Sequence, residues 1–79
     1  MQPCAVGADT WSVEAVPFKD PNVVWQGHQV LLAQIGIHIQ ETLDTTQLVR
    51  DGVAEFMFTH GQPRFRGAVQ AIINPVAIR

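Results

Sequence analysis

Apolar and polar positions change their spacing in the middle of this chain, and the change predicts where a helix gives way to a strand. The helical spacing i, i+3, i+4, i+7 predicts a short helix over residues 28–34, with an apolar face made of His28, Leu31, Leu32 and Ile35. Gly36 follows, which is the residue type expected just past the end of a helix. Residues 37–41 then alternate, so a strand should place Ile37, Ile39 and Glu41 on one side.

Shorter patterns on either side of this pair predict the remaining elements. We expect a short strand with a loop over residues 6–16. A second short helix, capped by Asp44 or Thr45, should run through Arg50 and end at Asp51-Gly52. Further strands are expected over residues 53–59, 64–68 and 71–78, and Pro75 places the last one at a sheet edge or a bulge. The order β-α-β-α-β-β-β predicts an α/β fold: a small mixed β-sheet with two short helices.

The composition changes this picture by indicating a partner. The chain has 79 residues, enough for a single domain over 1–79, and is 47% hydrophobic but only 15% charged. Ordinary globular domains are about 25% charged, so this one lacks the residues to coat a small domain with polar groups. We therefore expect a homo-oligomer, a dimer or higher, that covers residues 71–78 and the faces carrying Trp11, Trp25, Phe56 and Phe58.

Charge and segment composition exclude several classes of partner. The formal net charge is −2 and no basic cluster is present, which argues against a nucleic-acid partner. No apolar run approaches the roughly 18 residues of a membrane span, so no membrane association is expected. Cys4 is the one cysteine and no signal segment opens the chain, which together predict a cytoplasmic location.

His28 and Glu41 are the candidate metal ligands. His28 lies on the apolar face of the predicted helix, and Glu41 lies on the apolar side of the predicted strand. A carboxylate directed inward is costly unless it is paired or coordinates a metal, and imidazole with carboxylate suits Zn²⁺ or Mn²⁺. The alternative is a buried histidine with a hydrogen bond and a strand-end glutamate at a rim, and the spacing alone leaves both open.

Several segments, in order, resemble the cyclase family, metal-dependent hydrolases that include kynurenine formamidase and isatin hydrolase. Residues 6–14 (VGADTWSVE) are similar to the family's V-G-x-D-T-x-S-V-E segment, and His28-Gln29 with Leu31-Leu32 and Gly36-Ile37 to its next segment. Glu41 with Leu43-Asp44 follows, like the family's E-N-L or E-G-L. The later similar segments are residues 51–56 (DGVAEF), residues 67–68 (GA) and residues 74–78 (NPVAI).

The resemblance implies part of a metal site and also marks what is missing from it. It covers the C-terminal third or so of a family member, so the chain reads as a truncated cyclase-like domain. His28 and Glu41 match two family metal ligands. The H-x-G-T-H-x-D segment that supplies most of the others is not matched by residues 58–62 (FTHGQ). Residues 69–72 (VQAI) replace a small turn near the family's active site with an apolar run, which favours a pairing or interface strand.

Three functions are compatible with these patterns. The first is a truncated, non-catalytic relative of the cyclase family that acts through self-assembly or binding, with His28 and Glu41 as inherited metal positions. The second is a metal-dependent amide or lactam hydrolase whose Zn²⁺ or Mn²⁺ site is completed across a subunit interface or by a separate N-terminal partner. The third is a small-molecule binding module in which Trp11, Phe56 and Phe58 line a pocket for an aromatic ligand.

Overall fold

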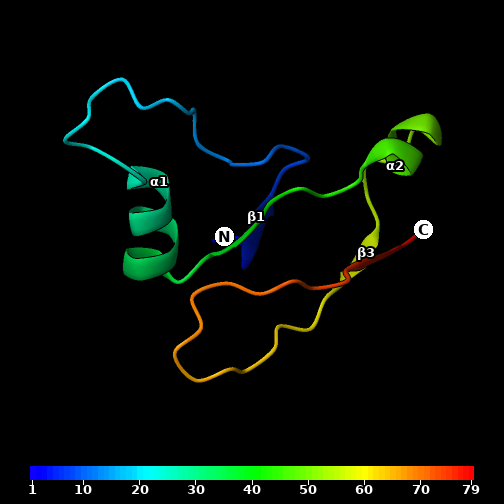
Figure 1. Ribbon diagram of the computed structural model, residues 1–79. Helices are drawn as coiled ribbons and strands as arrows, with labels where there is room; N and C mark the ends of the chain where they lie inside the picture. The colour runs from blue at the N-terminus through cyan, green and yellow to red at the C-terminus, as the bar shows by residue number, and fades with distance from the viewer. The chain divides into compact units, whose positions relative to one another are not determined.

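The computed structural model describes residues 1–79 and divides the chain into two compact units, Met1–Thr45 and Thr46–Arg79. The first unit has the element order β-helix-β. It contains β1 (Ala5–Gly7), α1 (Gln26–His28), which continues without a break into the wider π-helical turns of η1 (Gln29–Ile35), and β2 (His38–Gln40). The helix therefore begins two residues earlier than the pattern predicted, and β2 lies within the predicted strand. Figure 1 shows β1 and α1 of this unit.

β1 and β2 form a parallel pair, which requires a crossover connection such as the helix between them. Ala5 lies opposite His38, and Gly7 lies opposite Gln40. The pairing continues beyond the strands, because the backbone N–H of Leu43 donates to the carbonyl of Ala8 over 3.1 Å. These bonds hold the start of the long loop 8–25 beside the end of β2.

Gly36 ends the first helix as its sequence position predicted. Its φ of 75° lies in the left-handed region, and its N–H donates to the carbonyl of Leu31. The N–H of Ile37 donates to the same carbonyl over 2.7 Å, so the chain turns sharply from η1 into β2. Ile37 is the one buried hydrophobic residue of the chain, at 5% exposure.

The second unit contains α2 (Thr46–Arg50), β3 (Met57–Thr59) and β4 (Val76–Ile78). β3 and β4 form an antiparallel pair in which Phe58 lies opposite Ala77. The helix ends at Asp51 and Gly52 as predicted: Gly52 has a φ of 64°, and the N–H of Val53 donates to the carbonyl of Leu48 over 3.0 Å. The side chain of Arg79 forms an ion pair with Asp51, which joins the end of the chain to this turn.

The structure confirms a small mixed α/β fold with two short helices, but it has two separate two-stranded sheets, one parallel and one antiparallel. The strand predicted over residues 64–68 is wrong. Gly67 adopts a φ of 80°, and the N–H of Ala68 donates to the carbonyl of Phe65, which makes a turn there. The strand predicted over residues 71–78 is reduced to β4, since residues 71–75 pair with no strand.

Candidate functional site: a histidine between two carboxylates

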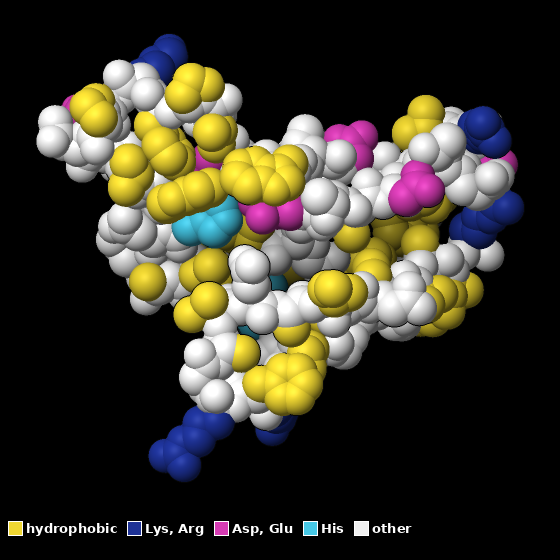
Figure 2. All heavy atoms as spheres, viewed as in Figure 1, with side chains coloured by type: hydrophobic (Ala, Val, Ile, Leu, Met, Phe, Trp, Pro, Cys, Tyr) yellow, Lys and Arg dark blue, Asp and Glu magenta, His cyan; other side chains and the backbone are white.

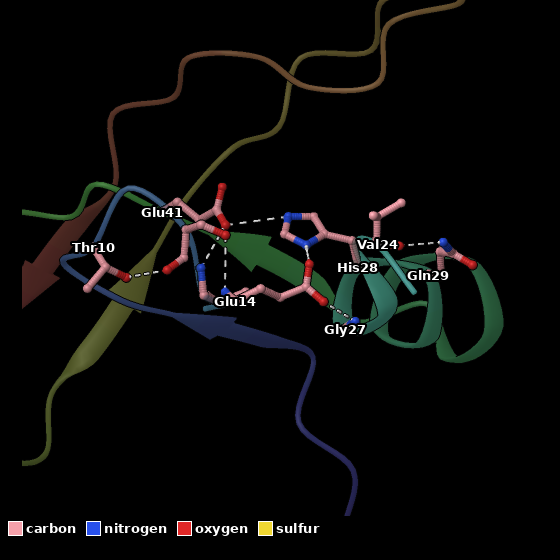
Figure 3. Close-up of polar contacts among 9 residues, drawn as sticks. Thr10, Glu14, Val24, Gly27, His28, Gln29 and Glu41 are labelled. Atoms are coloured by element: carbon pink, nitrogen blue, oxygen red, sulfur yellow. Dashed lines mark hydrogen bonds and ion pairs between the residues drawn. The ribbon is translucent and has the colours of Figure 1, made fainter. Parts of the chain in front are cut away.

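His28 and Glu41, the two predicted site residues, lie against each other in the first unit. His28 ends α1, and Glu41 follows β2 directly, so the crossover helix and the strand bring them together. Nε2 of His28 lies 3.4 Å from Oε1 of Glu41 (Figure 3). Both side chains are about three-quarters buried, with 24% and 28% of their surfaces exposed.

Glu14 is the third member of the cluster, and sequence spacing did not single it out. Its Oε2 lies 2.9 Å from Nδ1 of His28, on the opposite side of the ring from Glu41. Its other oxygen, Oε1, accepts a hydrogen bond from the backbone N–H of Gly27 (Figure 3). Glu14 comes from the loop between β1 and α1, where no periodic pattern predicts which way a side chain points.

The carboxylate of Glu41 has polar partners, as expected for a carboxylate that is directed inward and would be costly to bury alone. Besides its contact with His28, Oε1 of Glu41 accepts a hydrogen bond from the backbone N–H of Val13 over 2.9 Å. The two glutamates therefore tie the loop around residues 13 and 14 to the first turn of the helix. Both of these contacts of Glu41 are made by Oε1.

An aromatic cluster surrounds the ring of His28. Trp25 packs edge-on against His28 with ring centroids 5.1 Å apart, and Phe18 packs edge-on against Trp25 at 5.0 Å. Trp11 completes the cluster, 6.2 Å from Trp25. Trp25 itself has a φ of 53°, a left-handed conformation that is strained for a bulky side chain and that persists where the surroundings hold it.

The predicted pocket residues fall in different parts of the chain. Trp11 contacts Trp25 in the first unit, whereas Phe56 packs on Phe58 in the second, with ring centroids 6.1 Å apart. An open pocket beside the histidine cluster has other walls, and Trp11, Phe56 and Phe58 are not among them. Its lining comprises Glu14, Ala15, Phe18, Lys19, Asp20, Val23 and Gln26. A ligand site at Trp11, Phe56 and Phe58 thus stays a prediction.

The cluster fits part of a metal site. No group of three His, Cys, Asp or Glu side chains is arranged to hold a metal ion. Nε2 of His28 and Oε1 of Glu41 are two donors, and their 3.4 Å separation is the distance between two ligand atoms of tetrahedral Zn²⁺, about 3.4 Å for bonds of about 2.1 Å. Glu14 cannot add a third donor at that position, because both of its oxygens are used on the other side of the ring.

Compared with models of protein families, the chain matches none, and no curated protein or solved structure matches it. The resemblance to the cyclase family therefore rests on the sequence motifs alone. No helix of the structure has the length and the apolar character needed to cross a lipid bilayer.

Proposed function

We propose that this chain is a non-catalytic, cyclase-like domain that acts by assembling with copies of itself. The observation that carries the proposal is in the second unit, Thr46–Arg79, in which no residue is buried. This unit nevertheless contains many large apolar side chains. Val69 and Ile72 have 94% and 100% of their surface exposed, and Phe65 has 69%. Apolar surface of this kind on a soluble chain is a site for a protein partner.

Exposed large apolar side chains occur in both units. Figure 2 shows hydrophobic side chains at the surface over much of the face in view. A self-association of the kind seen in obligate oligomers would cover them.

The first helix supports the same proposal from the other unit. Leu32 and Ile35 belong to the apolar face that the helical spacing predicted, yet they are 42% and 45% exposed. A helix of this length depends on packing of its apolar face for most of its stability. The structure provides little cover for that face, and a second copy of the chain would provide it.

The experiment that tests self-assembly is the molar mass in solution, measured by light scattering and sedimentation at micromolar concentration. We expect a dimer or larger species for the natural chain. The double variant Val69→Lys with Ile72→Lys should dissociate, because a buried ammonium at an interface is strongly unfavourable. Val49→Lys is the control for an added ammonium elsewhere, since it places one lysine at another exposed valine, 74% exposed, on α2. A monomeric natural chain would contradict the proposal.

A second candidate function is favoured by the separation of Nε2 of His28 and Oε1 of Glu41. Two donors set 3.4 Å apart suit a shared divalent cation, and ligands from another chain would complete its coordination. Such an assembly would be a metal-dependent hydrolase, in which the cation activates water as the nucleophile. Calorimetric titration with Zn²⁺ and Mn²⁺ tests this function: micromolar binding that Glu41→Ala abolishes supports it, and no binding by the assembled protein contradicts it.

A further inference from the structure

Glu14 fixes which nitrogen of His28 carries the hydrogen when the ring is neutral. An ionised carboxylate accepts hydrogen bonds and cannot donate them. Because Oε2 of Glu14 lies 2.9 Å from Nδ1 of His28, Nδ1 must carry the hydrogen of that bond. In a neutral imidazole the other nitrogen, Nε2, then has a lone pair, and this nitrogen faces Glu41.

Gly27 makes this contact sterically feasible. A Cβ atom at position 27 would lie 2.8 Å from Oε1 of Glu14, closer than real Cβ contacts allow. The same oxygen accepts the N–H of Gly27, so the carboxylate lies directly against the backbone at the start of the helix. Only 15% of the Glu14 side chain is exposed. The glutamate, the glycine and the histidine thus form one packed unit.

Trp25 restrains the ring from another direction. Its edge-on contact with His28, at an interplanar angle of 80°, limits rotation of the imidazole. The ring is therefore held in position by packing and its hydrogen is placed by Glu14. In metal sites, an outer carboxylate commonly accepts the N–H of one histidine nitrogen and so directs the other nitrogen toward the ligand. Glu14 occupies the position of that outer carboxylate.

We propose that Glu14 is a positioning residue that selects the Nδ1–H tautomer of His28 and directs the Nε2 lone pair toward Glu41. Nε2 and Oε1 of Glu41 then form a paired acceptor for one divalent cation. The choice of tautomer stands on the contacts of Glu14 alone, while its use for a cation rests on the second candidate function. Glu14 contacts no ligand itself and acts through His28.

The tautomer can be measured directly by long-range ¹H–¹⁵N correlation of the imidazole of His28. At a pH at which the ¹⁵N shifts show a neutral ring, we expect the Nδ1–H form to predominate in the natural protein. Glu14→Gln should make it a minor form, because an amide NH₂ group facing Nδ1 donates and thereby favours hydrogen on Nε2. Gly27→Ala should act in the same direction while keeping every charge, because its Cβ displaces the carboxylate.

Glu55→Gln is the matched control, since Glu55 is an exposed glutamate of the other unit and should leave the tautomer of His28 unchanged. An Nε2–H tautomer in the natural protein would overturn the proposal without any variant. So would an unchanged Nδ1–H tautomer in Glu14→Gln that keeps the far-ultraviolet circular dichroism of the natural protein.

A Zn²⁺ titration of the same samples separates this inference from the function. If the second candidate function holds, Glu14→Gln should weaken Zn²⁺ binding by about 10- to 100-fold, the usual effect of losing an outer carboxylate. If the natural protein binds no Zn²⁺ but shows the Nδ1–H tautomer, the hydrolase function fails and the positioning role of Glu14 is upheld.

Discussion

Gln40 is the residue least satisfied by its surroundings. It is only 7% exposed, and neither its amide oxygen nor its amide nitrogen has a hydrogen-bond partner. Its backbone is well bonded, since its carbonyl accepts the N–H of Ala8 over 3.0 Å. The cost therefore lies in the side chain, and a buried amide without partners is unfavourable by about 1–3 kcal/mol.

Replacing Gln40 by Met should stabilise the protein. Methionine fills a similar volume and has no amide to desolvate, so we expect the free energy of unfolding to rise by about 1–3 kcal/mol in urea denaturation. Gln34→Met is the control, because Gln34 is exposed on η1 and its replacement should change stability by less than about 0.5 kcal/mol. A clear loss of stability in Gln40→Met would contradict this account of the amide as a group without partners.

Sequence reasoning reached two of the three residues in the charged cluster. Glu41 was identifiable because an alternating strand placed a carboxylate on its apolar side, where it needs a partner, and His28 because it lay on the apolar face of a helix. The contact between them follows from the helix and the strand meeting at Gly36. Glu14 ends the segment 6–14 that resembles the cyclase family, but its contact with His28 was not predicted. That contact depends on how the loop 8–25 folds back, and a loop has no period from which to infer the direction of a side chain.

At the scale of elements, the ends of the helices were easier to predict than the lengths of the strands. Gly36 and Gly52 both adopt the left-handed conformation that ends a helix, and this preference is local to the residue. A strand depends on a partner elsewhere in the chain. Residues 71–75 have an apolar sequence but no strand beside them, and Gly67 turns the chain where alternation suggested that it would continue.

Gly36 should therefore be sensitive to substitution. A φ of 75° is strained for any residue with a Cβ, so Gly36→Ala should lower the free energy of unfolding by about 1–2 kcal/mol. Steric overlap is not the cause, because an added Cβ would meet no atom within 4 Å. Gly61→Ala is the control, since its added Cβ also meets nothing within 4 Å and its φ lies outside the left-handed region. Equal effects of the two substitutions in urea denaturation would contradict this account of the helix end.

For the molecule as a whole, we expect the free energy of unfolding to be inseparable from the free energy of association. Ile37 is the only buried hydrophobic residue, so the chain alone lacks the apolar core that normally offsets the loss of conformational entropy. If a second copy supplies that burial, folding and association are coupled by mass action. The separated chains would then be less ordered than the assembled ones, and no monomer of comparable stability would exist.

This coupling predicts that the thermal midpoint depends on protein concentration. For a dimer that unfolds as it dissociates, each tenfold increase in concentration adds about 1.4 kcal/mol per dimer, enough to raise the midpoint by several degrees. Calorimetry over two decades of concentration measures the effect. The double variant Val69→Lys with Ile72→Lys should have a lower midpoint with little dependence on concentration, because its chains no longer gain burial by associating. A natural chain whose midpoint is high and independent of concentration would carry its own stability, and its exposed apolar residues would need another explanation.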